Sequence, residues 1–177
     1  MRAVPITVIA LAAAFLLTAC GGGDDSASGD GESKASSASG TACAAGDLTM
    51  AAGAVNAAPA AGDTGNVTVT VTNGGKECTL DGFPEVELEA DGTTVAVPRD
   101  EAAESQPLPL AEQGTASFTI TYARGEDGDG SLAVKTLKYG LPDASATDSL
   151  DWSYGAVALK DGDVPDASVS AFQVAGD

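Results

Sequence analysis

The stretch NVTVTVTN, Asn66 to Asn73, decides the fold class of this 177-residue chain. Valines stand at positions 67, 69 and 71 and threonines at positions 68, 70 and 72, so apolar and polar side chains alternate with a period of two. Because successive side chains of a β-strand point to opposite faces, the alternation predicts a strand with one buried face and one solvent face. The Asn-Gly-Gly that begins at Asn73 marks the end of the strand.

The same period recurs on the C-terminal side of this stretch. EVELEA, residues 85–90, places Val86 and Leu88 on one face, and the Asp91-Gly92 turn then predicts a hairpin. TASFTITYA, residues 115–123, alternates in the same way. Further strands are expected over residues 48–55, 132–137, 155–159 and 167–174.

No segment shows a long apolar stripe with the period of 3.6 residues that an amphipathic helix needs. Short strands joined by turn signals at this density are typical of β-sandwiches. The sequence therefore predicts an all-β chain, folded as an antiparallel immunoglobulin-like β-sandwich of about seven or eight strands.

Charge excludes one class of partner. The chain has 26 acidic and 8 basic residues and no histidine, which gives a formal net charge of -18. A field of this sign repels phosphate backbones, so no nucleic-acid partner is expected. Aromatic residues make up only 5% of the chain, so its core must be built mainly from aliphatic side chains.

The N-terminus has the pattern of an export signal. Arg2 precedes an apolar run from Val4 to Leu17, which is shorter than the roughly 20 residues that a membrane-spanning helix needs. The run ends in Leu17-Thr18-Ala19-Cys20, which resembles the lipobox of bacterial lipoproteins. This resemblance implies a signal peptide over residues 1–19, fatty acylation of Cys20, and a protein held on the extracellular side of the cell membrane. An ordinary signal peptide that ends by chance in small residues and a cysteine is the alternative.

A polar segment separates Cys20 from the strands. Residues 20–42 consist almost entirely of Gly, Ser, Ala and Asp, and they contain no large apolar side chain that could repay the entropy of ordering. We expect a disordered linker with an end-to-end distance of about 25 Å. The β-sandwich domain is then expected over residues 43–177.

Cys43 and Cys78 form an even pair once Cys20 is acylated. In an exported protein, a disulfide is the expected state of such a pair, and closing this loop would stabilise the fold by roughly 3.8 kcal/mol. A metal site would need further soft ligands, and a catalytic thiol would need a cationic neighbour. These two alternatives are weaker because the chain has no histidine.

Motifs for catalysis are missing. A Ser-His-Asp triad is impossible without histidine, and neither Gly-x-Ser-x-Gly nor Ser-x-x-Lys occurs. The loop from Glu126 to Ser131 carries oxygen ligands at alternate positions, but Lys138 stands where an EF-hand would place its closing glutamate. We interpret this loop as an acidic turn, with calcium binding left open, and we expect no enzyme activity and no cofactor.

Trp152 and Tyr154 are the candidate binding residues. They stand two positions apart in LDWSYG, so on a strand they would share one face and could contact a sugar or a peptide. A lone tryptophan in a small sandwich is more often part of the core.

Several of these residues resemble the family called domain of unknown function 4232, which is common in secreted lipoproteins of actinobacteria. The resemblance is carried by Cys43, by the valine-rich strand that ends at Asn73, by CTLDGFPEVEL from Cys78 to Leu88, and by PLAEQGTASF from Pro109 to Phe118. In that family the two cysteines are expected to pair. Gln113 departs from the pattern, because the family has a proline there.

The resemblance covers about residues 41–122. Many members carry a second cysteine pair after this region, and this chain has none. Membership implies a sandwich-like extracellular domain but no activity. The expected function is therefore a non-catalytic binding or display module with an unknown envelope or extracellular partner, and the alternative is a structural or accessory envelope protein.

Overall fold

The computed structural model describes residues 40–126, 128, 130–142, 148–160 and 162–175. Within these ranges the only helical element is one 3-10 turn, Ala45–Asp47, and all other regular elements are strands. The prediction of an all-β chain is confirmed. The predicted signal peptide, Cys20 and the linker up to residue 39 lie outside the described residues. No helix in the described ranges has the length and apolarity needed to cross a membrane.

The larger sheet has five strands and contains the alternating stretch of residues 66–73. Its spatial order is β1 (Leu48–Asn56), β2 (Thr64–Asn73), β7 (Thr115–Ala123) and β13 (Ala167–Val169), and β14 (Gln173–Val174) pairs with the other half of β7. All of these pairs are antiparallel. The valines of β2 are fully buried and the threonines at positions 68, 70 and 72 are half-buried, as the alternation predicts.

Three smaller sheets complete the domain, and all their pairs are antiparallel as well. The four-stranded sheet has the order β10 (Asp148–Asp151), β9 (Thr136–Gly140), β4 (Glu85–Ala90) and β5 (Thr93–Ala96). A three-stranded sheet has the order β12 (Val164–Pro165), β11 (Val157–Lys160) and β8 (Ser131–Leu132), and a two-stranded sheet pairs β3 (Cys78–Leu80) with β6 (Leu108–Leu110).

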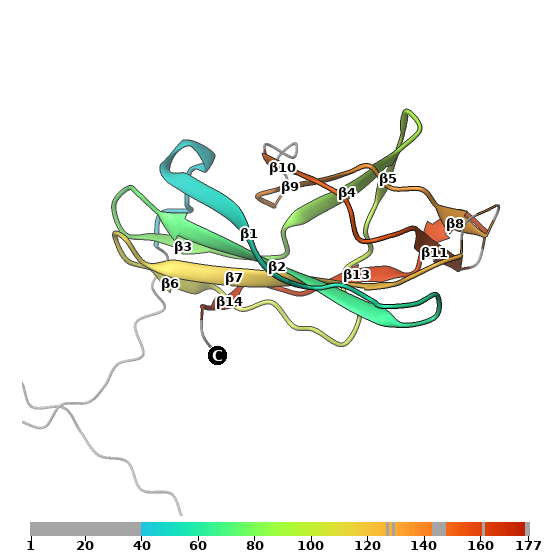
Figure 1. Cartoon of the computed structure of the whole chain (residues 1–177). Helices are drawn as coiled ribbons and strands as arrows, with labels where there is room; N and C mark the ends of the chain where they lie inside the picture. The colour runs from blue at the N-terminus through green and yellow to red at the C-terminus, as the bar shows by residue number, and fades with distance from the viewer. Residues whose placement is uncertain (1–39, 127, 129, 143–147, 161, 176–177) are drawn as a thin grey trace, which may run out of the picture. The chain divides into compact units, whose positions relative to one another are not determined.

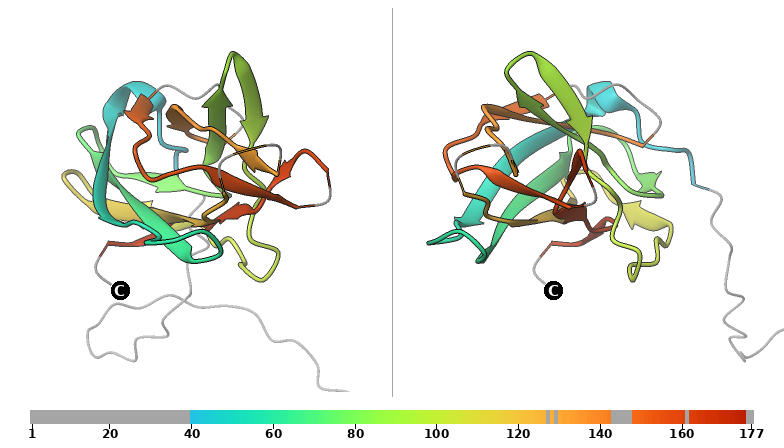
Figure 2. Two further views of the ribbon diagram at one scale, coloured as in Figure 1. Left: turned by 45° about the vertical axis from the view of Figure 1, so that its right-hand side comes forward. Right: turned by 90° about the vertical axis from the view of Figure 1, so that its right-hand side faces the viewer.

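The two larger sheets face each other across one hydrophobic core. In Figure 1 the five-stranded sheet forms the lower layer, and β4, β5, β9 and β10 form the upper layer. Phe118 of β7 and Tyr139 of β9 meet between the layers, with ring centroids 6.2 Å apart. The β4–β5 hairpin projects at the top of both views in Figure 2.

Two predicted strands are wrong because the chain bends within them. The strand expected over residues 132–137 is divided into β8 and β9, which belong to different sheets. Between them Val134 is buried and its N–H donates to the carbonyl of Leu132, while the N–H of Lys135 donates to the carbonyl of Glu89. An alternating sequence does not reveal this change of sheet, because both halves keep an apolar residue facing the core.

The strand expected over residues 167–174 is divided in the same way into β13 and β14. The expected number of strands is therefore too small, since the described ranges contain fourteen, several of only two or three residues. Elements this short, such as β3, β6 and β12, contain too few residues for a period to be visible.

Candidate functional site

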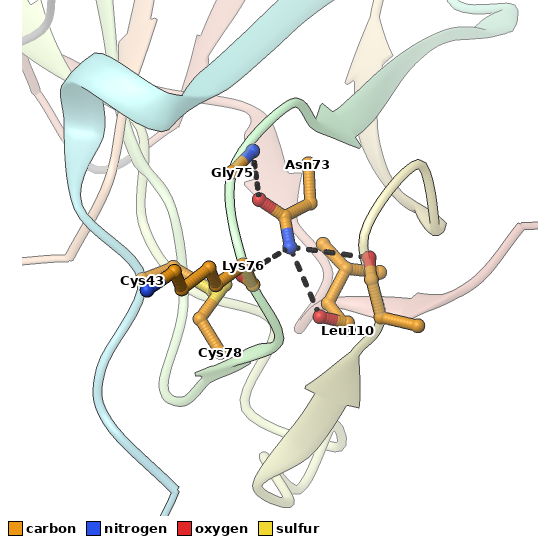
Figure 3. The surroundings of a disulfide bond; sticks show 7 residues. Cys43, Asn73, Gly75, Lys76, Cys78 and Leu110 are labelled. Carbon is orange, nitrogen blue, oxygen red and sulfur yellow. Dashed lines mark hydrogen bonds between the residues drawn. A yellow bond between two sulfur atoms is a disulfide. The ribbon is translucent and has the colours of Figure 1, made fainter.

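Cys43 and Cys78 form a disulfide, as the cysteine count predicts. Cys78 is buried in β3 and Cys43 precedes the first turn of the domain. Figure 3 shows the bond beside the turn that leads from β2 into β3. The two cysteines are 35 positions apart in sequence, and the segment between them includes all of β1 and β2.

Asn73 fixes the turn next to this disulfide. Its side chain is fully buried and is the only buried polar side chain of the described residues. The Nδ2 group donates toward the carbonyls of Lys76 (2.8 Å), Leu110 (3.1 Å) and Ala111 (3.1 Å), and Oδ1 accepts from the N–H of Gly75 (2.9 Å) (Figure 3). Because every polar atom of the amide is used, Asn73 ties the β2–β3 turn to the β6–β7 turn without leaving an unsatisfied group.

The N-terminal segment enters the domain alongside β3. The N–H of Thr79 donates to the carbonyl of Thr41 (2.9 Å), and the N–H of Cys43 donates to the carbonyl of Thr79 (3.1 Å). Ala42 and Thr79 thus form a parallel bridge. The entry point is held by two backbone hydrogen bonds and one covalent bond.

Trp152 lies in the core, and the structure corrects the prediction that it shares a strand face with Tyr154. β10 ends at Asp151, so both aromatic residues lie in the connection to β11. Trp152 is 7% exposed and its Nε1 donates to the carbonyl of Gly155 (2.7 Å). Its ring forms T-shaped contacts with the rings of Tyr122 and Tyr154, with centroids 4.8 and 4.9 Å away. Of the two candidates, only Tyr154 keeps a partly exposed side chain.

Tyr122 connects three segments at this end of the domain. Its hydroxyl accepts from the N–H of Ala58 (3.2 Å) and donates to the carbonyl of Tyr154 (3.2 Å). Its ring lies against Gly65 in the neighbouring strand, where a Cβ would be 2.5 Å from the ring. The alternation over residues 115–123 predicts that Tyr122 faces the core. Nothing in the sequence indicates that its hydroxyl forms hydrogen bonds with two other segments.

Arg124 holds the adjoining loop through its guanidinium. Nη1 donates to the carbonyls of Ala58 (3.0 Å) and Pro59 (2.9 Å), and no carboxylate of the described residues pairs with it. No role for Arg124 was predicted from the sequence. The only sequence feature that could have indicated one is its position directly after the predicted strand that contains Tyr122.

A surface hollow of about 580 Å³ lies next to Arg124. Gly62, Gly125, Gly128 and Gly130 contribute to its wall, and Ser131 contributes a hydroxyl. The N–H groups of Gly62 and Gly125 already donate to the carbonyls of Arg124 and Ala156. The main polar groups of the wall are therefore the side chains of Arg124, Glu126 and Ser131, which suit a polar ligand. Trp152 and Tyr154 are not part of this wall.

The acidic loop from Glu126 to Ser131 borders the hollow. Its Asp127 and Asp129 lie outside the described residues, so the structure does not test whether this loop binds calcium. Elsewhere in the described ranges, no three His, Cys, Asp or Glu side chains gather in a way that could hold a metal ion.

Surface ion pairs occur away from the hollow. Lys135 pairs with Asp91 and Lys138 with Glu89 (2.6 Å), and in each case the hydrogen bond and the charge of the carboxylate raise the pKa of the lysine. Both pairs are exposed to solvent, so they add little stability.

Comparison with known proteins gives one match. A family model described as domain of unknown function (DUF4232) matches residues 43–173, which is most of the chain. No curated protein and no solved structure matches it. The match extends beyond the part that the sequence resemblance covered and includes the region of Trp152, Tyr154 and Arg124. Because the model spans the disulfide, both large sheets and the hollow, the chain belongs to the DUF4232 family.

Proposed function

We propose that this protein is a lipid-anchored, cell-surface domain of immunoglobulin-like β-sandwich architecture that acts as a non-catalytic binding or display module. Cys20 carries the lipid, residues 20–42 give the domain reach, and the sandwich presents its loops to an envelope or extracellular partner. A structural or accessory envelope protein is the alternative.

The observation that carries the proposal is the Cys43–Cys78 disulfide at the point where the linker meets the domain. Disulfides persist in oxidising compartments and are rare in the cytosol, so the bond supports export. The apolar run that ends in Leu17-Thr18-Ala19-Cys20 supports the same route and adds an attachment point. Two acyl chains give stable membrane binding, whereas one chain gives only marginal binding.

The architecture is supported by the opposed sheets. Alternate residues of β2 and β7 face the core from one layer, and Leu88, Leu137 and Tyr139 face it from the other. Such two-layer packing of antiparallel sheets is the arrangement of immunoglobulin-like sandwiches.

The binding role is supported by the hollow beside Arg124. Its wall combines a guanidinium without a carboxylate partner among the described residues, the hydroxyl of Ser131 and the carboxylate of Glu126. These groups suit a polar partner rather than an apolar one.

The anchor is tested by expressing the whole chain in a bacterium that acylates lipoproteins and measuring the intact mass of the membrane-bound product. We expect a chain that begins at residue 20 and carries a diacylglyceryl group. Cys20→Ala should lose the lipid, whereas Cys78→Ser should keep it. A wild-type product with an unmodified Cys20 would contradict the anchor.

The binding role is tested by placing a photo-crosslinking residue at Ala61, which is exposed at the rim of the hollow. A matched crosslinker at Thr94, exposed in β5, is the control. Adducts with envelope material that form at Ala61 and not at Thr94 would support binding. If neither position yields an adduct on intact cells, the structural or accessory alternative replaces the binding role.

A further inference from the structure

The linker joins the domain beside β3, which is not the first strand of the chain. The chain enters beside β3, next in sequence runs through β1 and β2, and returns to β3 at Cys78. The disulfide therefore connects the entry point directly to β3 and closes residues 44–77 into a covalent loop. A pulling force applied to the linker passes through the disulfide and leaves this loop unloaded.

Without the bond, only the two backbone hydrogen bonds with Thr79 would hold the entry point, and once they break the load would pass to β1. This strand is at the edge of the five-stranded sheet and pairs only with β2. Its register is interrupted by a bulge between Ala52 and Val55. When force is applied to the first residue of an edge strand, its hydrogen bonds can break one pair after another, so β1 could be peeled away at low force.

With the bond intact, the load enters the domain at β3, which has neighbours on both sides. β3 has β6 on one side and Thr41 to Cys43 on the other. Leu80 of β3 is 2% exposed, and the hydrogen bonds of Asn73 hold the turn that precedes Cys78. Loading β3 therefore requires several contacts to break together rather than in succession.

We propose that the Cys43–Cys78 disulfide is a mechanical bypass, which carries tension from the membrane anchor into β3 and protects the edge strand β1 from being peeled off the sheet. When an added dithiol reduces the bond to two thiols and is itself oxidised to a disulfide, the load passes to β1, and the linker lengthens at the expense of the domain. The biological setting rests on the anchor proposed above, but the force path itself depends only on the fold.

The test is single-molecule stretching of the chain from residue 20 to residue 177, with Cys20→Ser and an enzymatic handle at each end. In the oxidised protein we expect unfolding to begin only with the main core transition. In the reduced protein we expect an earlier step at lower force, in which β1 leaves and residues 44–63 become an extended chain of at most about 70 Å.

The control attaches the first handle at Asp81, an exposed residue just after β3, instead of at the N-terminus. Force then bypasses β1 in both redox states, so reduction should add no early step. An early step in the oxidised protein pulled from the N-terminus, or its absence in the reduced protein, would overturn the proposal. Since the handles replace the lipid, a failure here is distinguishable from a failure of the anchor, which would appear only in the mass of the membrane-bound product.

Discussion

At the scale of single residues, Asn73 shows how one polar side chain can define a turn. It ends the strand of alternating valines and threonines, and in a folded chain its burial would be costly if any atom of the amide lacked a partner. The partners come from two turns that are almost forty residues apart in sequence. The side chain of Asn73 thus forms hydrogen bonds with backbone groups at the place where β2 ends.

Replacing this side chain should be more destructive than its size suggests. Asn73→Ala removes all four hydrogen bonds of the amide, including those with the buried carbonyl of Leu110 and the N–H of Gly75, so we expect a loss of about 3 kcal/mol in the free energy of unfolding. Asn66→Ala, on the same strand, removes only one half-buried hydrogen bond with Thr121 and should cost about 1 kcal/mol. Urea unfolding of both variants measures the difference, and equal losses would contradict the role assigned to Asn73.

At the scale of elements, Ser170 explains why one long strand became two. Its Oγ accepts from the N–H of Thr119 (3.0 Å), and its own N–H donates to the carbonyl of the same residue. The side chain thus takes the place of a backbone acceptor between β13 and β14. Both short strands can pair with β7 although the chain bends between them.

Ser170→Ala should therefore weaken this junction. We expect a loss of about 1 kcal/mol in unfolding free energy, because the N–H of Thr119 loses its acceptor, together with faster hydrogen exchange at that amide. Ser168→Ala is the matched control, since Ser168 lies on β13 and pairs with Thr121 through its backbone. If exchange at Thr119 stayed unchanged in Ser170→Ala, the junction would depend on backbone contacts alone.

The same scale shows what the sequence could predict. The strands at residues 66–73, 85–90 and 115–123 were found because an alternating pattern of six or more residues has only one reading. The breaks at Val134 and Ser170 were not found, because they depend on partners distant in sequence. Trp152 was placed on a strand because spacing alone cannot show where β10 ends. Arg124 was missed because its partners are backbone carbonyls, which no side-chain pattern reports.

At the scale of the whole molecule, alkaline pH should destabilise the fold. Burial raises the pKa of Tyr139, the charge of Asp148 raises it further, and a hydrogen bond with the backbone of Ala52 lowers it. The pKa values of Lys135 and Lys138 are also raised. A group whose pKa is higher in the folded state stabilises the fold below its unfolded pKa, and that stability is lost as the pH rises through its folded pKa.

We therefore expect these groups to make stability independent of pH near neutrality, and stability to fall above about pH 10, where unfolded tyrosine and lysine titrate. Tyr139→Phe should reduce the loss of stability at alkaline pH, because it removes the buried phenol. Tyr154→Phe, at a half-buried position, is the matched variant and should leave more of the fall in place. Chemical denaturation across the alkaline range is the measurement, and equal pH profiles for wild type and Tyr139→Phe would refute the assignment.

The hydrogen bonds of Asn73 also bear on chemical ageing. Asn73 is followed by Gly74, and an asparagine before a glycine is prone to deamidation. The backbone nitrogen of the glycine attacks the side-chain carbonyl carbon, ammonia leaves, and water opens the resulting succinimide to aspartate or isoaspartate. Here the amide is held by its three carbonyls and Gly75, and the N–H of Gly74 donates to the carbonyl of Asp47 (2.7 Å). Both reacting groups are engaged elsewhere as long as the domain is folded. Each opening of the domain releases them, so aspartate and isoaspartate at position 73 would accumulate as a lasting record of how often a long-lived molecule has unfolded.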